Sequence, residues 1–348
     1  MNDDGRREAI SLARRALLSR AGRAGLGIAA GIPLASWLAA CGGQSSATQR
    51  QTPTGAPTIA PTATSDTRPV TIAITGDLML ARSVGQRLLA TSDTFPFTHT
   101  GDFLRGFDLT VGNLECVVST LGAPQPKQYT FEAPVKSFER LVAAGFDIVS
   151  LANNHSGDYG KAAFSDMLGK LPGYGLTPLG GGMNRTAAHT PVIRTVHGTT
   201  LGFLAYCEIQ PQNFAATDTS PGHAWLEEVS MRADIQAARP QADFLIVFQH
   251  WGVEYETVET SHQQALARAA IDAGADLVVG AHPHVIQPHE IYKSKPIIYS
   301  LGNFVFDEMW GVAAVGNVLT LTVQGSRLVD WKLRSARIGD FGQPDWIQ

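Results

Sequence analysis

Short apolar stretches alternate with amphipathic ones along the chain from Val70 onward. Runs of four to seven mostly apolar or β-branched residues are typical of strands, and apolar residues spaced three or four apart are typical of helices. Strand-like and helix-like stretches follow one another in chain order, which predicts an α/β fold rather than an all-β fold. Because no repeat of solenoid period is present, we expect one globular domain over residues 70–348.

The predicted strands cover residues 70–75, 109–111, 146–151, 192–196, 200–206, 244–248, 277–279, 296–300, 318–323 and 329–338. One predicted helix ends near residue 90, and three others cover residues 137–144, 160–171 and 262–273. Two strand pairs are expected to form hairpins, one around His197-Gly198 and one at the end of the chain that closes a sheet edge. Residues 210–222 show little periodicity, which predicts a long surface loop.

The first 41 residues are typical of an export signal rather than of a folded segment. Six arginines up to Arg23 precede an uncharged stretch of small apolar residues, which ends in Leu38-Ala39-Ala40-Cys41. This ending resembles the bacterial lipobox, in which the cysteine, here Cys41, receives lipid. An uncleaved membrane anchor is the alternative, and both place the rest of the chain outside the cytoplasm. Arg14-Arg15 also resembles a twin-arginine signal, so we expect Sec or twin-arginine export.

Composition adds a tether and excludes one class of partner. Residues 42–69 are rich in Thr, Pro and Ser and have few large apolar side chains, which predicts a disordered tether. The net charge of −4 shows no basic excess, so nucleic-acid binding is not indicated. Cys116 and Cys207 could pair in an oxidising compartment, but we favour buried, unpaired thiols.

Polar side chains follow most of the predicted strands at the point where each strand ends. They are Asp77, Glu115, Asn154 with His155, His250, and His282 with His284. Strand ends of α/β sheets form binding sites, so these side chains are expected to meet in one site. Carboxylate, amide and imidazole donors without a thiolate suit Mn²⁺, Fe²⁺ or Zn²⁺. The donors exceed what one tetrahedral ion takes, and two ions ~3.5–4 Å apart would use them all for phosphoryl chemistry.

These segments also carry a family resemblance. Gly76-Asp77, Gly112-Asn113-Leu114-Glu115, Leu151-Ala-Asn-Asn-His155, His250-Trp251-Gly252, Gly280-Ala-His-Pro-His284 and Tyr299-Ser-Leu-Gly-Asn-Phe304 resemble motifs of the CapA family of poly-γ-glutamate capsule-synthesis proteins. That family is similar to calcineurin-like metallophosphoesterases. The resemblance implies a four-layer αββα sandwich, in which two packed mixed sheets are flanked by helices and metal is held at the strand ends.

The resemblance also implies a role for each residue. Asp77 and His284 would bind the first metal, Glu115 would bridge, and Asn154, His250 and His282 would bind the second metal. His155 would be the general acid or a hydrogen-bond donor to the transition state. Two departures from the phosphoesterase pattern stand out, because Asp77 is followed by Leu78 and Met79 where an Asp-x-His is usual, and Glu115 replaces an aspartate.

Further residues have both a functional and a plainer interpretation. Asp158 would orient His155, and Glu254 would act as a base or hydrogen-bond acceptor unless it is a solvated loop carboxylate. Arg82 would contact an anionic substrate unless it is a helix-surface arginine, and Asn303 would line the site unless it is a turn residue. The remaining histidines, His189, His197, His223, His262 and His289, are assigned to the surface or to loops.

The combined hypothesis is a lipid-anchored extracytoplasmic protein that acts in synthesis, export or anchoring of an anionic capsular polymer through a metal-dependent hydrolase site. The alternative is a non-catalytic, metal-containing subunit that holds the polymer for a membrane synthase complex. A solute-binding lipoprotein would fit the signal and tether but would leave the histidine, aspartate and asparagine clusters without a purpose.

Overall fold

The computed structural model describes residues 68–91 and 94–347. The predicted signal peptide, Cys41 and nearly all of the predicted tether lie outside these residues, so their roles stay predictions. The described residues belong to one compact unit. In the described part of that unit, every helix is too short or too polar to cross a membrane.

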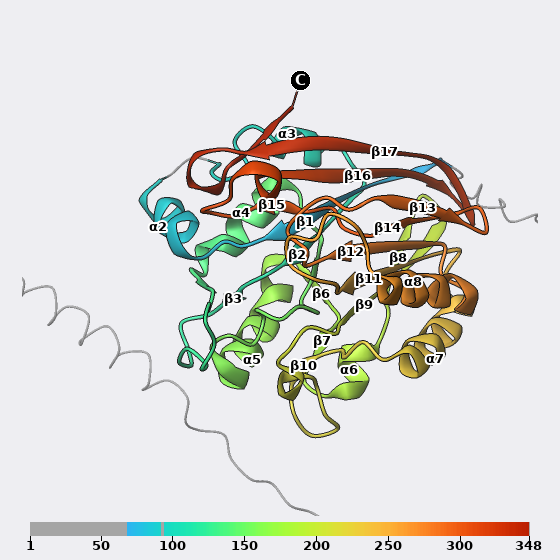
Figure 1. Cartoon of the computed structure of the whole chain (residues 1–348), viewed down its shortest axis with the longest axis horizontal. Helices are drawn as coiled ribbons and strands as arrows, with labels where there is room; N and C mark the ends of the chain where they lie inside the picture. The colour runs from blue at the N-terminus through green and yellow to red at the C-terminus, as the bar shows by residue number, and fades with distance from the viewer. Residues whose placement is uncertain (1–67, 92–93, 348) are drawn as a thin grey trace, which may run out of the picture. The chain divides into compact units, whose positions relative to one another are not determined.

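Two large sheets form the centre of the described unit (Figure 1). The larger sheet contains β1 (Val70–Leu78), β2 (Leu109–Leu114), β5 (Ile148–Ser150), β6 (Thr177–Leu179), β15 (Asn303–Val305), β16 (Val315–Gln324), β17 (Arg327–Ile338) and β18 (Pro344–Trp346). Its strand order is β18-β17-β16-β1-β2-β5-β6, with β15 also paired to β1. The second sheet contains β8 (Val192–Val196), β9 (Thr199–Cys207), β11 (Phe244–His250), β12 (Leu277–Ala281), β13 (His289–Tyr292) and β14 (Lys295–Ile298) in the order β13-β14-β12-β11-β9-β8. Both sheets mix parallel and antiparallel pairs.

Helices and small strand pairs complete the unit. The helices are α2 (Arg82–Ala90), α3 (Gly101–Leu104), α4 (Lys136–Ala144), α5 (Gly160–Lys170), α6 (Arg185–His189), α7 (Glu228–Ala238) and α8 (Ser261–Ala273). Short 3₁₀ helices cover Leu171–Tyr174, Gln212–Phe214, Arg239–Gln241, Gly311–Ala314 and Asp340–Gly342. β3 (Val117–Val118) pairs with β4 (Glu132–Ala133), and β7 (Gly181–Gly182) pairs with β10 (Gly222–His223).

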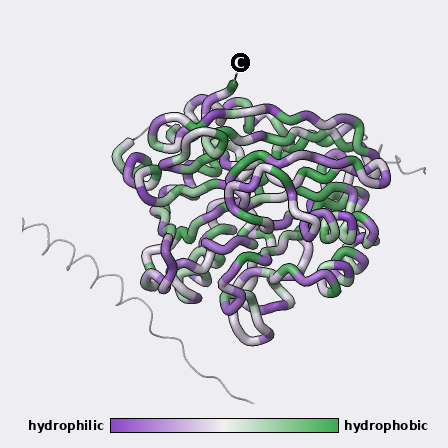
Figure 2. The backbone as a smooth tube through the Cα atoms, in the orientation of Figure 1, coloured by the Kyte–Doolittle hydropathy of each residue, from purple (hydrophilic) through white to green (hydrophobic). Residues whose placement is uncertain are grey.

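The sheets stack because their central strands are apolar on both faces. On β11, Phe244 and Ile246 face the core between the sheets, whereas Leu245 and Val247 face α7 and α8. Side chains alternate between the faces of a strand, so a continuous apolar run covers two cores at once. A third core lies between the larger sheet and α2 to α5. Figure 2 shows green, hydrophobic stretches recurring along the strands of both sheets. The expected sandwich of two mixed sheets flanked by helices is confirmed.

Most of the predicted elements are present, and the main differences concern residues 210–238. The hairpins β8–β9 and β16–β17 form as expected, and β18 extends the edge beyond the second one. The stretch predicted as a surface loop instead buries Phe214, whose ring lies 5.4 Å from that of Phe164. Helix α7 was not predicted, although its buried Met231, Ile235 and Ala238 have helical spacing.

The assignment of His223 to the surface is wrong. Its side chain is 1 % exposed and packs near the rings of Phe214 and Trp225. Burial lowers the pKa of His223 to about 4, so the ring is neutral and apolar enough to join the core. Cys116 and Cys207 are buried free thiols, as expected, and burial raises the pKa of Cys116 to about 12.

Candidate metal site

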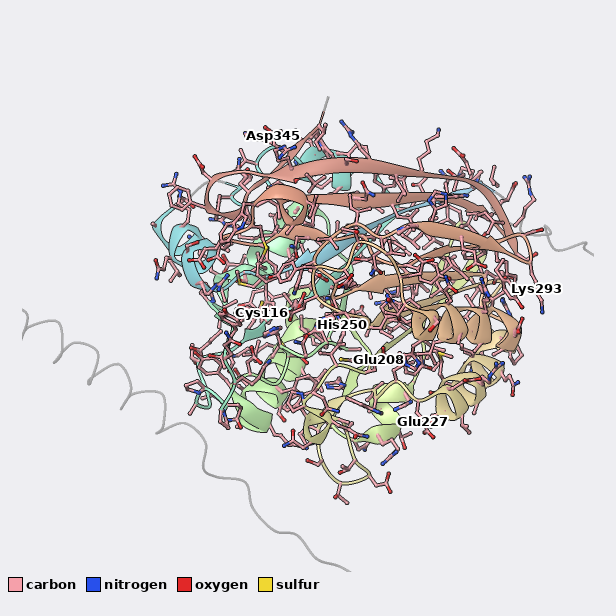
Figure 3. All side chains as sticks on the ribbon, viewed as in Figure 1. Cys116, Glu208, Glu227, His250, Lys293 and Asp345 are labelled. Carbon is pink, nitrogen blue, oxygen red and sulfur yellow. The ribbon has the colours of Figure 1, made fainter. Side chains whose placement is uncertain are left out.

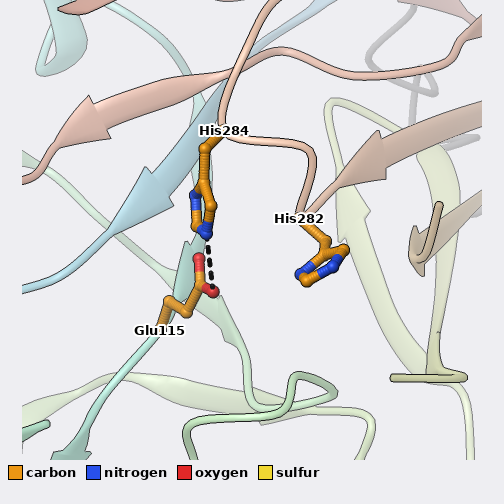
Figure 4. A group of neighbouring side chains, drawn as sticks. All are labelled: Glu115, His282 and His284. Carbon is orange, nitrogen blue, oxygen red and sulfur yellow. Dashed lines mark ion pairs between the residues drawn. The ribbon is translucent and has the colours of Figure 1, made fainter. Parts of the chain in front are cut away.

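The predicted ligands converge between the carboxyl ends of strands from both sheets. Asp77 is the penultimate residue of β1 and Glu115 follows β2, while His250 ends β11 and His282 follows β12. One ligand atom from each of Glu115, His282 and His284 lies within 4.8 Å of the others, and the same holds for Asp77, Glu115 and His250. The two groups share Glu115. Figure 4 shows the ring of His284 facing the Glu115 carboxylate, with His282 beside them, and Figure 3 places His250 in the interior.

Strand register places these side chains. Asp77 lies opposite Asn113 on β2, and His250 lies opposite Ala281 on β12, one residue before His282. Two glycines allow the strands to approach closely at these ends. A Cβ on Gly76 would lie 1.8 Å from the Gly302 carbonyl oxygen, and one on Gly280 would lie 1.9 Å from that of Tyr299. A larger residue at either position would therefore push apart the strands that carry the ligands.

The backbone at the two neighbouring histidines is held in an unfavourable conformation. His282 has φ of 95° and His284 has φ of 58°, on either side of Pro283. Non-glycine residues rarely adopt positive φ, and such strain concentrates at functional sites. The conformation turns both rings toward Glu115, which fits a ligand role for the pair.

The electrostatics of the cluster are those of a cation site. Glu115 is fully buried, and burial followed by the nearby charge of Asp77 raises its pKa well above the ordinary value. Burial and the neighbouring imidazoles lower the pKa values of His250 and His282 well below the ordinary value. Burial opposes the charged form of His284, but the Asp77 carboxylate 3.3 Å from its Nδ1 outweighs burial and raises its pKa. The lowered pKa values of His250 and His282 favour neutral imidazoles, the form in which histidine binds metal.

Several buried side-chain atoms in the cluster that could bind a metal ion have no hydrogen-bond partner among the described residues. Both carboxylate oxygens of Glu115 and Nδ1 of His282 are in this condition. The Oε1 atom of Glu115 lies 3.6 Å from His250 Nε2 and 3.8 Å from His284 Nε2, which is too far for a hydrogen bond. An unsatisfied buried carboxylate is costly, and a divalent cation would satisfy it. The residues present therefore fit a divalent metal ion.

Asn154 and His155 lie at the border of the cluster. The Oδ1 atom of Asn154 is 2.8 Å from Nε2 of His250. His155 Nδ1 is 2.6 Å from Oδ2 of Asp158, and its ring stacks on Phe131 with centroids 4.1 Å apart. Burial lowers the pKa of His155, against the opposing effect of Asp158. Asp158 and Phe131 thus fix the ring of His155, and Nε2 is the ring nitrogen left to interact with a ligand in the cavity that His155 lines.

Sequence reasoning assigned no role to two residues that hold the site together. Asn113 donates to Asp77 Oδ1 at 2.8 Å and lies 3.3 Å from His250 Nδ1, so it links ligands of the two sheets. Its place at the end of a predicted strand was a usable signal. Lys127 donates to Asp158 Oδ1 at 2.6 Å and to the Asn154 carbonyl at 2.7 Å. Because Lys127 comes from a loop without periodicity, no pattern in the sequence indicates it.

The remaining predicted residues surround a cavity of about 470 Å³ beside the cluster. Glu254 and Arg82 line this cavity, and Glu254 is exposed. Arg82 pairs with Asp307, and its guanidinium lies over the ring of Phe131 at 5.0 Å. Asn303 lies instead behind His284, accepting from its Nδ1 at 3.0 Å and donating to its carbonyl at 3.0 Å. The geometry of Asn303 is that of a residue that orients a ligand.

Comparison with known proteins places the chain among capsule synthesis proteins. The family described as bacterial capsule synthesis protein PGA_cap matches residues 71–308. The capsule biosynthesis protein CapA of Bacillus anthracis is 32% identical over 72% of this chain and 63% of its own length. The PGA biosynthesis protein CapA of Bacillus subtilis is also 32% identical, over 76% of this chain and 68% of its own length. The chain therefore spans about two thirds of these relatives.

One solved structure has a similar fold. A hypothetical protein from Thermus thermophilus aligns with a TM-score of 0.51 and 17% identity, over 76% of this chain and 98% of that one. A putative 5′-nucleotidase from Staphylococcus aureus aligns with a TM-score of 0.48 and 14% identity, over 76% of this chain and 54% of that one. The match over residues 71–308, together with the two relatives at 32% identity, shows that this chain belongs to the bacterial capsule synthesis protein (PGA_cap, CapA) family.

Proposed function

We propose that this protein is a metal-dependent hydrolase of the phosphoesterase type that acts on an anionic capsular polymer, such as poly-γ-glutamate, or on a precursor of it. The observation that carries the proposal is the buried Glu115 carboxylate without a hydrogen bond among His250, His282 and His284. Of these residues, His284 lines a cavity together with His155. Family membership supports the capsule context, because the relatives are named for capsule and poly-γ-glutamate biosynthesis.

Different side chains of the site would have different roles in the reaction. Divalent ions at the cluster would supply Lewis-acid chemistry to a phosphoryl centre and to the attacking water. Asp77, Glu115 and the three buried imidazoles would hold those ions, and Asn113 would keep Asp77 and His250 in register. His155 would exchange a proton with the reacting groups through Nε2, because Asp158 accepts from Nδ1 and fixes the ring.

Two measurements test this proposal. The full-length protein should retain one or two equivalents of Mn²⁺, Fe²⁺ or Zn²⁺ and should hydrolyse a generic phosphodiester when Mn²⁺ is added. His155→Ala should lower turnover by about 10² to 10⁴-fold with metal content unchanged, since proton transfer by a positioned side chain contributes that much. His289→Ala is the matched control, because His289 is exposed on the edge strand β13 and packs against Trp331 of β17. If His155→Ala turns over the ester as fast as the unmodified protein, the catalytic role of His155 is rejected.

A second candidate function is a non-catalytic subunit that holds polymer carboxylates for a membrane synthase. It is favoured by Leu78 and Met79, which are buried in the core after Asp77, where phosphoesterases carry a histidine ligand. This candidate predicts metal-dependent binding of poly-γ-glutamate by calorimetry, together with no hydrolysis of esters or of the polymer.

The proposed location is the outer face of the cell membrane, with lipid on Cys41 and residues 42–69 as the tether. The support is the sequence pattern Leu38-Ala39-Ala40-Cys41 alone. Cys41→Ser should move the protein from the membrane fraction to the soluble fraction and abolish metabolic labelling with palmitate. Membrane association without lipid in the unmodified protein would instead indicate an uncleaved anchor.

A further inference from the structure

The mouth of the cavity beside the metal cluster carries large apolar side chains that are exposed to solvent. Tyr129, Tyr255, Trp310 and Val312 are 56%, 55%, 76% and 66% exposed, and all four line the cavity. We call these four residues the apolar rim. Single exposed apolar residues are ordinary, but a group of them around a cavity marks a binding site.

Deeper in the cavity the wall remains apolar and becomes rigid. Phe131 and Phe306 are 4% and 3% exposed, and their rings meet edge to face at 5.7 Å. Phe131 also stacks on His155, and Phe306 contacts the ring of His284 with centroids 5.1 Å apart. An apolar surface therefore runs from the rim to the side chains of the metal cluster.

The charges at the mouth disfavour a ligand rich in carboxylates. Among the described residues that line the cavity, Arg82 is the only one with a fixed positive charge, and Asp307 and Glu308 pair with it. Glu254 and Glu308 add two negative charges to the wall. Like charges repel one another at an interface, so the carboxylates of the wall would disfavour a ligand that carries several carboxylates of its own.

We propose that the apolar rim is a subsite for an uncharged hydrocarbon or aryl group that is joined to the single anionic group held at the metal cluster. The substrate of the proposed hydrolase is then an ester with an apolar flank, that is, a precursor rather than a run of polymer carboxylates. This inference rests on the proposed metal site. The acidic mouth argues against docking on an anionic membrane, since such surfaces attract basic segments.

Binding of small phosphonates tests the subsite without any turnover. The full-length protein is loaded with Mn²⁺, its metal content is measured, and phenylphosphonate and methylphosphonate are titrated by calorimetry. Phenylphosphonate should bind about tenfold more tightly, because contact with the rim removes roughly 50–60 Å² of apolar surface from water. Trp310→Ala should remove most of that difference and leave methylphosphonate unaffected. Val229→Ala is the control, because Val229 on α7 is about as exposed as Trp310 but does not line the cavity, and it should change neither affinity.

A third ligand tests the charge argument. 4-Carboxyphenylphosphonate should bind more weakly than phenylphosphonate, and Glu308→Gln should recover part of the loss. Equal affinity for the phenyl and methyl ligands, or a preference for the carboxylated one, would overturn the proposal and favour a polymer chain in the cavity.

Failure of the metal site can be told apart from failure of the rim. If Mn²⁺ does not bind, the proposed function fails, and the rim is then judged by fluorescence. A fluorescence change with phenylphosphonate that is absent in Trp310→Phe would retain the rim. The lack of any such change would reject it as well.

Discussion

At the scale of single residues, Glu115 decides the behaviour of the site. It is fully buried, neither of its oxygens has a hydrogen bond among the described residues, and it belongs to both groups of candidate ligands. In the absence of metal such a side chain opposes folding whenever it is ionised, because its charge is not solvated and lies beside the charge of Asp77. A bound cation would offset this cost.

Glu115→Gln should therefore have opposite effects in the metal-free and metal-bound states. In chelator-treated protein at neutral pH, the substitution should raise the free energy of unfolding by roughly 1–3 kcal/mol, because the neutral amide avoids both the burial of a charge and the repulsion by Asp77. Metal should then give the variant almost no stabilisation, whereas the unmodified protein should gain about 2.7 kcal/mol at 100 times the dissociation constant. Denaturant unfolding with and without Mn²⁺ measures both effects. A variant that is less stable without metal would contradict this account.

Protonation of the ligands should make metal binding depend on pH. The pKa values of Glu115 and His284 are raised, so protons compete with metal at a higher pH than they would for free side chains. Affinity for Mn²⁺ should thus rise with pH and continue to rise above the ordinary pKa values of these two groups, with release of protons on binding. Calorimetry in buffers of different ionisation enthalpy counts those protons, and a flat affinity without proton release would be inconsistent with the cluster as the binding site.

The sign of the corresponding stability change differs between groups. A raised pKa in the folded state means that the stabilising contribution of Glu115 is present below its ordinary pKa and is lost as pH rises through the raised value. The lowered pKa values of His250 and His282 act in reverse, since their contribution is present above pH ~6.5 and is lost as pH falls. The metal-free protein should accordingly lose stability in both directions from an intermediate pH.

At the scale of elements, the close approach of strand ends is the requirement that the fold must meet. Gly76 and Gly280 each lie against a backbone carbonyl at a strand end that delivers ligands. Gly169 on α5, by contrast, has open space where a Cβ would be placed. The three glycines therefore allow one substitution to be compared in crowded and open settings.

Gly280→Ala should lower the free energy of unfolding by about 3 kcal/mol or more, because a methyl group 1.9 Å from a carbonyl oxygen forces the strands apart. Gly169→Ala should instead be neutral or stabilise the protein by up to ~1 kcal/mol, since alanine favours a helix. Urea unfolding measures both variants. Equal destabilisation by the two substitutions would show that close strand approach is unimportant.

The elements also show what the sequence could predict. Strands with apolar residues on both faces, such as β11, identify themselves by composition, and the polar residue after each one indicated a shared site. Lys127 could not be predicted, since its contact with Asp158 depends on how a loop without periodicity folds over the site. His223 was misassigned because a histidine in an irregular stretch gives no sign that aromatic neighbours will bury it. The strands and the polar residues that follow them could thus be predicted from the sequence, whereas the packing of the loops could not.

At the scale of the whole molecule, the candidate ligands connect the two sheets. Asp77 and Glu115 belong to the larger sheet, and His250, His282 and His284 belong to the second. A bound ion would add bonds across the core between the sheets, where packing is otherwise apolar. Metal should therefore stabilise the two sheets against separation rather than either sheet alone.

Hydrogen exchange can test this link. Addition of Mn²⁺ should slow amide exchange at the ends of β1, β2, β11 and β12, because local opening of either sheet would require release of the ion. Strand β17 lies two strands away from β1 in the larger sheet, so it should be unaffected and serves as an internal control. Protection that appears in one sheet alone would show that the ion does not join them.

The candidate ligands are also far apart in sequence, with Asp77 and His282 separated by 205 positions. During synthesis Asp77 and Glu115 are added to the chain long before the three imidazoles, so a nascent fragment that ends before His284 lacks part of the donor set. An ion that needs all five side chains could therefore be bound only after His284 has been added. Fragments that end before His284 would be distinguished by their failure to retain the ion.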